Sequence, residues 1–322
     1  MSNICHKLNS NHKKQFYFPA MLIALLVVLL FNQSYSQIPG SYFAVHCEVG
    51  SETRLFPTLQ QLVASANSHN IPLTIEFTPP WAESILADSL KLKLIRQWQA
   101  EGHEIAAHHH ATYYNDGWDG YTNDPSYISD PKYKGDMQDY LALLNRLAGD
   151  YPLLTGGITA ASMDWPGDNM QYRTTGFAIT DAKSEPILET LNSHEHYFIG
   201  YGALVRNDLL DSAENLYGLT KENEVFGLVT HVMNFTPDRE QQAIEAWFEF
   251  AEGKNNKTVT QIMSDRGQGP VVSIVTMEPE KLNKKLFFSN STVRYQTSSS
   301  GTTIFNIFDI LGRKTKIYEN QK

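Results

Sequence analysis

Two clusters of histidine and glutamate stand at the ends of apolar segments in this sequence. The motif HCE occupies 46–48, and three consecutive histidines occupy 108–110. Side chains alternate along a strand, so His46 and Glu48 would share one face, as would His108 and His110 if the chain stays extended. One carboxylate and two imidazoles form a ligand set that suits zinc and leaves a coordination position open for water.

A divalent metal in such a set polarises a carbonyl group and lowers the pKa of water, which is the chemistry of hydrolysis. The competing interpretation is that three consecutive histidines only form a polar loop. We favour a metal site because Glu48, His108 and His110 all follow segments with the pattern of strands.

The elements that position these residues alternate in type along the chain. Strands are expected at 42–48, 71–77, 103–107, 153–160, 197–205, 226–232 and 271–277, and helices at 56–69, 84–101, 137–148, 186–191 and 239–252. Such alternation predicts parallel strands covered by helices, in an α/β barrel or an open α/β sheet. In both folds the active site lies at the carboxyl ends of the strands.

The stretch that joins the two clusters resembles the polysaccharide deacetylases of the nodulation-deacetylase type. NIPLTIEFTPPW at 70–81 is similar to the strand of that family written IPATFF, and EGHEIAAH at 101–108 is similar to its GHEIxxH. Order and spacing agree over 44–110. The resemblance implies a distorted (β/α) barrel that uses a divalent metal, usually zinc, to remove acetyl groups from amino sugars or xylose residues.

The resemblance carries over to individual residues with two departures. The family motif TFDDG falls on 46–50, so Glu48 matches its catalytic base, while Val49 replaces its metal-binding aspartate. The second histidine of the family's next motif would fall on Thr112. Some relatives carry HxH after GHEI, and 108–110 resembles that form. The implied ligands are therefore Glu48, His108 and His110, with His46 as a fourth candidate, and Glu48 is either a ligand or the base.

Further site residues follow from the same resemblance. FGLVTH at 226–231 is similar to the family's late strand, whose final histidine is a general acid, so His231 is either that acid or a hydrogen-bonded rim residue. Arg173 is the nearest match to an expected arginine motif. Asp164 and Trp165 follow the fourth strand and are expected either to hold the shape of the site or to touch substrate.

An insertion at 111–136 is rich in aromatic and acidic residues. Aromatic rings near carboxylates are a common way to bind sugars, so Tyr113 and Trp118 are expected to contact substrate. The alternative is a long loop that packs its own aromatic rings. Long loops at a catalytic face tend to be functional.

The first 36 residues have the pattern of a cleaved secretory signal. Lys13 and Lys14 precede the apolar run 21–31, and Ser34 and Ser36 stand where a signal peptidase needs small residues. A retained membrane anchor is the alternative, but eleven residues span only about 16 Å as a helix. We therefore expect a secreted or periplasmic protein. Cys47 is then the one cysteine left, so no disulfide within the chain is expected.

Charge limits the partners. The chain has a formal net charge of −9, and without the basic leader the remainder stands at −12. Nucleic acids and anionic membranes would repel such a protein, so neither is expected to bind after cleavage of the signal. The oligomeric state is left open.

The composition changes near the C-terminus. The expected domains are a signal at 1–36, a deacetylase-like barrel at 37–280 and an extension at 281–322. Within the extension, TIFNIFDILGRK at 303–314 resembles part of the sorting tail used by type IX secretion. The alternative is a small terminal hairpin packed on the barrel.

The function expected from these features is that of a secreted, metal-dependent carbohydrate deacetylase, which hydrolyses an acetyl amide or ester. The alternative is an inactive carbohydrate-binding protein on the same barrel, as Val49 and Thr112 would allow. A third hypothesis is a glycosidase that uses Glu48 with Glu76 or Asp164 as its carboxylate pair.

Overall fold

The computed structural model describes residues 39–158, 164–167, 169–176, 178–203 and 207–268, and the backbone of four strands between 284 and 320. The leader expected at 1–36 and the strand expected at 271–277 lie outside these residues. In the described part of the chain, the model contains no helix long and apolar enough to cross a membrane.

Within the described residues, seven strands of at least four residues run parallel in one curled sheet. They are β1 (Ser41–Cys47), β2 (Leu73–Phe77), β3 (Glu104–His109), β4 (Thr155–Ile158), β5 (Tyr172–Thr175), β8 (His194–Gly200) and β10 (Val225–His231). Their order is β10-β1-β2-β3-β4-β5-β8. The short β9 (Gly202–Ala203) follows β8 and pairs in parallel with β10, so the sheet curls back on itself. The distorted (β/α) barrel is confirmed.

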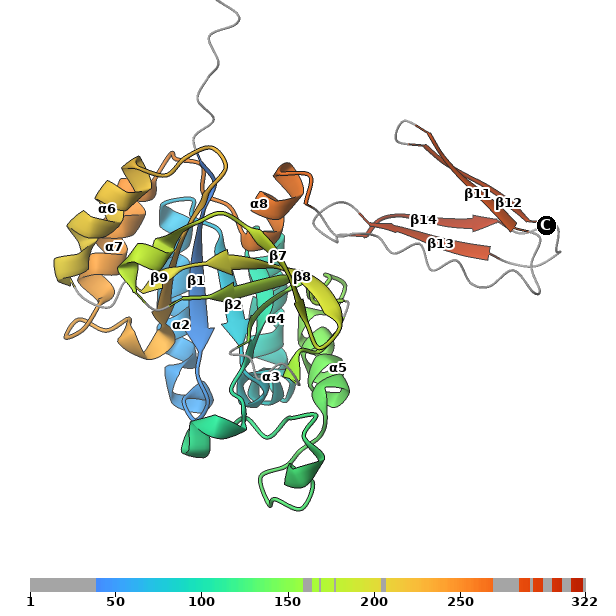
Figure 1. The fold of residues 1–322 in the computed structure, drawn as a ribbon, viewed down its shortest axis with the longest axis horizontal. Coiled ribbons are helices and arrows are strands. Elements are labelled where there is room, and N and C mark those ends of the chain that lie inside the picture. The colour runs from blue at the N-terminus through green and yellow to red at the C-terminus, as the bar shows by residue number, and fades with distance from the viewer. Residues whose placement is uncertain are drawn as a thin grey trace, which may run out of the picture. The chain divides into compact units, whose positions relative to one another are not determined.

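Helices cover the outside of this sheet (Figure 1). They are α2 (Glu52–Ser68), α3 (Pro79–Leu86), α4 (Ser89–Ala100), α5 (Met137–Ala148), α6 (Leu210–Gly218), α7 (Gln241–Ala251) and α8 (Val259–Asp265). On β1, Phe43 and Val45 join the large apolar core shared with the helices, whereas Tyr42 and Ala44 belong to a second buried cluster. The period-two alternation of a strand buried on both faces produces these two layers.

Two expected elements differ from the structure. The segment expected as a helix at 186–191 is a strand, β7 (Ile187–Leu191), which pairs antiparallel with β8. Asn192 and Ser193 form the turn between them with φ of 48° and 65°, which is the geometry of a tight hairpin. The single helix expected at 84–101 is two helices, because Asp88 caps the backbone N–H groups of Leu90 and Lys91 and begins α4.

The insertion leaves the barrel at the carboxyl end of β3. It contains two short 3-10 helices, η1 (Thr112–Gly117) and η2 (Pro125–Tyr127), and in Figure 1 it is the green segment at the end to which the β1 and β2 arrows point. The insertion therefore lies at the end of the sheet where an active site is expected.

The sheet also contains a short strand, β6 (Lys183–Ser184), which pairs antiparallel with β10.

Two hairpins account for the described strands beyond residue 283. Strand β11 (Lys284–Ser289) pairs with β12 (Thr292–Thr297), and β13 (Thr303–Phe308) pairs with β14 (Lys314–Asn320). The segment that resembles a sorting tail, 303–314, contains all of β13 and the first residue of β14, and its sorting role stays a prediction.

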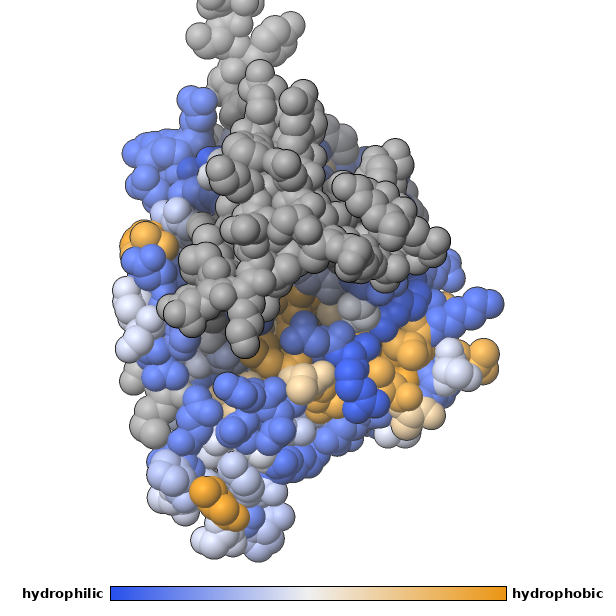
Figure 2. All heavy atoms as spheres, turned by 90° about the vertical axis from the view of Figure 1, so that its right-hand side faces the viewer, coloured by the Kyte–Doolittle hydropathy of each residue, from blue (hydrophilic) through white to orange (hydrophobic). Residues whose placement is uncertain are grey.

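The surface of the described barrel is mixed in character. Figure 2 shows apolar side chains gathered on one face, with hydrophilic side chains among them, beside them and below them. Among the described residues, the exposed large apolar side chains include Ile187 and Leu188 on β7, and Tyr113 and Tyr114 in the insertion.

Candidate metal centre

Strand register brings the chemical residues together. His231 on β10, His46 on β1 and Glu76 on β2 are successive register partners, so their side chains enter the barrel side by side. On β3 the register partner of Glu76 is Ala106, and His108 lies two residues further along the same face of the strand, where it pairs with Gly157 of β4. The lack of a side chain at Gly157 leaves room for its neighbours.

The end of β1 is fixed by hydrogen bonds to its backbone. The carbonyl oxygen of Glu48 accepts hydrogen bonds from Ser51 Oγ at 2.7 Å and from Trp81 Nε1 at 2.8 Å. Thr78 Oγ1 donates to the carbonyl oxygen of Cys47 at 2.8 Å. Trp81 belongs to the FTPPW segment and is fully buried, so the motif that resembles a family strand also holds Glu48 in place.

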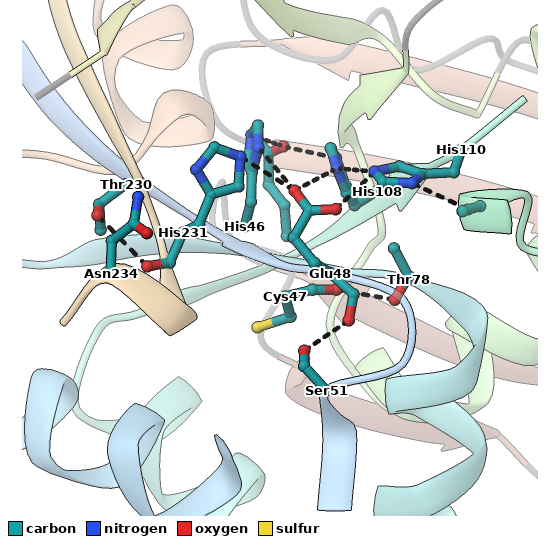
Figure 3. Close-up of polar contacts among 12 residues, drawn as sticks. His46, Cys47, Glu48, Ser51, Thr78, His108, His110, Thr230, His231 and Asn234 are labelled. Atoms are coloured by element: carbon teal, nitrogen blue, oxygen red, sulfur yellow. Dashed lines mark hydrogen bonds and ion pairs between the residues drawn. The ribbon is translucent and has the colours of Figure 1, made fainter. Parts of the chain in front are cut away.

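The Glu48 carboxylate lies at the centre of four imidazoles (Figure 3). Its Oε2 is 2.6 Å from His110 Nε2, and its Oε1 is 3.1 Å from His231 Nε2. The same Oε1 is 3.5 Å from His108 Nε2 and 3.8 Å from His46 Nδ1. The four imidazoles and the carboxylate predicted from sequence therefore form one cluster.

The carbonyl group of Gly117 determines which ring nitrogen of His110 carries a proton. The Nδ1 atom of His110 is 3.0 Å from the carbonyl oxygen of Gly117, and a carbonyl can only accept, so Nδ1 carries the proton. In the neutral ring, Nε2 then has the free lone pair. That Nε2 is 3.1 Å from His108 Nε2, so two imidazole nitrogens and a carboxylate point at one small volume.

A second carboxylate lies behind the histidines. Glu76 is fully buried, and its Oε2 is 3.1 Å from His46 Nε2 and 3.7 Å from His108 Nδ1. Its Oε1 accepts a hydrogen bond from Thr174 Oγ1 at 2.6 Å. Glu76 was predicted from the sequence only as half of a glycosidase pair, and its full burial is incompatible with contact to a substrate.

The protonation equilibria of the cluster follow from burial and charge. Burial alone would raise the pKa of Glu48, but the charge of His108 and the three close imidazoles hold it well below its usual range. Burial would lower the pKa of His108, yet the two carboxylates raise it to about 10. Burial and the neighbouring His108 lower the pKa of His46 to about 4. The proton on His108 thus offsets part of the charge of the two carboxylates, and a cation can replace it.

The donor set fits a divalent metal ion. Three groups of the described residues place three ligand atoms within 4.8 Å of one another: His46, Glu48 and His231; His46, Glu76 and His108; and Glu48, His108 and His110. Imidazole nitrogen and carboxylate oxygen are ordinary zinc ligands. The third group is the set expected from sequence, and the Gly117 carbonyl orients one of its imidazoles as an outer-shell acceptor does.

The middle histidine of the triplet supports the other two. His109 is fully buried, and its Nδ1 is 2.8 Å from Asp119 Oδ2. The same oxygen accepts a hydrogen bond from the backbone N–H of His110 at 3.0 Å. Asp119 was noted in the sequence only as one of several acids in the insertion, so this bracing role was not predicted.

Four residues that were expected to bind substrate are mostly buried and contact other residues of the barrel. Trp118 and Trp165 are 6% and 1% exposed, so neither ring offers a face to a sugar. Asp164 is buried and accepts hydrogen bonds from Thr122 Oγ1 and the N–H of Asn123, which fits the shape-holding alternative. Arg173 donates to the carbonyl oxygen of Ile158 and pairs with Glu189, its Nη1 being 3.3 Å from Oε2.

The exposed aromatic residues of the insertion lie beside the cluster. Tyr114 stacks on the His110 ring with centroids 4.6 Å apart, and Tyr113 lies against Tyr114 at 4.7 Å. Tyr113 is 55% exposed and Tyr114 is 39% exposed. The substrate-binding residue predicted here, Tyr113, therefore has ring surface available, and Tyr114 links it to the candidate ligand His110.

Comparison with known proteins adds a likeness of fold. No protein-family model and no curated protein matches the sequence. A structure from Mycobacterium smegmatis, named as a polysaccharide deacetylase, matches over 72% of this chain and 92% of its own, with 10% identity and a TM-score of 0.50. A Pseudomonas aeruginosa PAO1 structure of the same name matches over 68% and 86%, with 15% identity and a TM-score of 0.48. An allantoinase matches over 72% and 91%, with 14% identity and a TM-score of 0.49. At 10% identity the first likeness shows a shared fold alone.

Proposed function

We propose that this chain is a secreted hydrolase of the polysaccharide deacetylase type, which removes an acetyl group from a carbohydrate with the help of one divalent metal ion. The observation that carries the proposal is the Glu48 carboxylate surrounded by four imidazoles at the carboxyl end of a (β/α) barrel. The fold shared with the Mycobacterium smegmatis structure and the sequence resemblance support the same class of reaction.

Glu48, His108 and His110 would hold the ion, and zinc suits this donor set. A bound ion supplies Lewis acidity to a carbonyl oxygen and lowers the pKa of water in its coordination sphere. Glu48 acts as a ligand in this assignment because both of its oxygens face imidazoles. His46 is the fourth candidate ligand, its Nδ1 facing the same carboxylate.

His231 is the candidate general acid. Its side chain is 40% exposed, whereas His108 is 5% exposed, so His231 is the imidazole that an entering substrate can reach. Its Nε2 lies 3.1 Å from Glu48 Oε1, which holds the ring toward the centre. An imidazole in this position is placed to donate a proton to the leaving alcohol or amine.

A carbohydrate is the proposed substrate because aromatic ring surface lies next to a candidate ligand. The stacked Tyr113 and Tyr114 rings extend from His110 toward solvent. A sugar ring packs its apolar face on such a surface while its hydroxyl groups stay hydrated. Secretion, proposed from the leader sequence, would bring the protein to extracellular glycans.

The test combines metal removal with product analysis. The purified mature chain is stripped with a chelator and then assayed for acetate release from acetylated chitooligosaccharides and acetylated xylan, with and without added zinc. We expect activity only after zinc is restored. Zinc-independent acetate release would reject the metal, whereas glycan binding without acetate release would favour the inactive carbohydrate-binding alternative.

A further inference from the structure

Three buried atoms of the cluster face one another on the side of His108 opposite to its proposed metal-binding nitrogen, Nε2. They are His46 Nε2, Glu76 Oε2 and His108 Nδ1, and none of them makes a hydrogen bond of normal geometry in the described structure, either to one another or to other residues. The carboxylate oxygen is 3.1 Å from the first nitrogen and 3.7 Å from the second. A buried carboxylate is stable only with charged or hydrogen-bonded partners, so these two imidazoles are its partners.

The surroundings keep Glu76 in this place. Thr174 Oγ1 donates to its other oxygen at 2.6 Å. Gly157 lies on β4, two strands away from Glu76 on β2. A Cβ atom at this position would lie 1.9 Å from Glu76 Oε2 and 2.9 Å from His108 Nδ1. The carboxylate therefore occupies space that only a glycine leaves open. With no exposed surface, it can act on a substrate only through the histidines.

We propose that Glu76 is a positioning residue that fixes the proton of two histidines at once. Its negative charge, 3.1 Å from His46 Nε2 and 3.7 Å from His108 Nδ1, favours a proton on each of these nitrogens. The lone pair of His108 Nε2 is then directed at Glu48 and His110, where the metal is proposed to bind. The inference rests on that proposed centre for its effect on metal affinity. The placement of the protons follows from the contacts of Glu76 alone.

The chemistry requires a carboxylate at this position. Each oxygen of Glu76 is a pure acceptor. One accepts the hydrogen bond of the Thr174 hydroxyl, and the other presents its negative charge to both imidazoles. A glutamine has only one acceptor oxygen. If that oxygen stays with Thr174, its NH2 group faces the two rings, which must then accept, and the His108 proton moves to Nε2. A proton there competes with a metal ion for the same lone pair.

The variant Glu76→Gln tests this arrangement, and Glu104→Gln is its matched control. Glu104 is another carboxylate inside the barrel, bonded to threonines and without an imidazole partner in the described structure. Zinc affinity is measured by competition with a chromophoric chelator. We expect Glu76→Gln to weaken binding by roughly 10- to 100-fold, as loss of an outer-shell partner does, while Glu104→Gln stays at the wild-type value. Glu76→Asp, which keeps the charge, should recover part of the affinity.

Nitrogen-15 NMR of the histidine rings supplies a readout that does not depend on metal or activity. In metal-free wild-type protein, we expect His46 with its proton on Nε2 and His108 with a proton on Nδ1. In Glu76→Gln both signals should change, and they should not change in Glu104→Gln. Thr174→Val gives a milder perturbation, expected in the same direction, should Glu76→Gln fail to fold.

Two results would overturn the inference. The first is a Glu76→Gln or Thr174→Val variant with the ring protonation and zinc affinity of the wild type. The second is a wild-type chain that binds two zinc ions and loses one of them in Glu76→Gln, because the three atoms would then be ligands of a second ion. A wild-type chain that binds no zinc would reject the proposed function, and the NMR comparison would still decide the role of Glu76.

Discussion

Two glutamates inside the same barrel, on neighbouring strands, have opposite environments. Glu76 on β2 faces the imidazoles of His46 and His108, and these lower its pKa to about 2 although burial would raise it. Glu104, the first residue of β3, lies at the amino end, where burial raises its pKa. Its carboxylate accepts hydrogen bonds from the hydroxyls of three threonines, Thr74, Thr155 and Thr260.

The difference shows how the barrel separates stability from chemistry. At the amino end, neutral hydroxyl donors tie Glu104 to β2, β4 and α8, which joins elements that are distant in sequence. At the carboxyl end, the donors around Glu48 and Glu76 are imidazoles, which can exchange a proton for a metal ion. The same residue type thus serves packing at one end and the candidate site at the other.

The largest effect is expected from removing both histidines of the proposed ligand set. The double variant His108→Ala/His110→Ala should abolish zinc binding, because it removes two of three ligands and leaves Glu48 alone. Metal content after dialysis, measured by mass spectrometry, checks this. The control is His69→Ala, which removes a surface histidine paired with Glu252. Unchanged stoichiometry in the double variant would place the metal elsewhere.

A smaller loss is expected when Glu48 loses its charge. An amide oxygen offsets a cation less well than a carboxylate, so Glu48→Gln should lose zinc affinity and acetate release together. Calorimetric zinc titration and the acetate assay, run on the same preparation, separate the roles. Full metal occupancy with turnover reduced by about a hundredfold or more would make Glu48 the base and His46 the next ligand to test. A variant that keeps both properties would show that the β1 end is not the site.

The general acid can be tested without loss of the metal. His231→Gln should keep zinc bound and lower turnover by roughly 10²- to 10⁴-fold, because only proton donation to the leaving group is removed. Substrates with a better leaving group, such as an aryl acetate, should lose less activity. If His231→Gln releases the metal instead, the group of His46, Glu48 and His231 holds the ion.

The smallest effect concerns the stability contributed by the amino end. A raised pKa means that folded Glu104 keeps a proton that the unfolded chain has already released, so its contribution to stability falls as pH rises above the ordinary carboxyl pKa. Glu104→Gln cannot ionise and should lack this part of the decline. Urea unfolding of both proteins at several pH values gives the comparison, and parallel curves would contradict it.

Strand periodicity predicted the barrel because its parallel strands are short apolar runs with clear boundaries. It failed at β7, where the Asn192–Ser193 turn, and not the composition of 187–191, determines the structure. It also missed β5, whose sequence YRTT carries one aromatic residue among polar ones. Pairing with neighbouring strands stabilises such a segment, and that information is not local.

The ligand set was predictable because its members stand at strand ends, and because His108 and His110 are two residues apart. The roles of Glu76 and Asp119 were not predicted, since each depends on contacts with histidines on other segments of the chain. A charged residue within the apolar run LTIEF was still a usable signal, because a buried glutamate requires a partner. The burial of Trp118 and Trp165 could not be deduced from the sequence, since aromatic residues in a long loop pack inward or outward with the same pattern.

The central claim is that one metal ion binds between Glu48, His108 and His110. Anomalous X-ray diffraction from crystals of the zinc-loaded protein, recorded on both sides of the zinc absorption edge, locates the ion directly. We predict a single peak within bonding distance of Glu48, His108 Nε2 and His110 Nε2. A peak bounded by His46, Glu76 and His108 Nδ1, or no peak in the barrel at saturating zinc, would contradict the account.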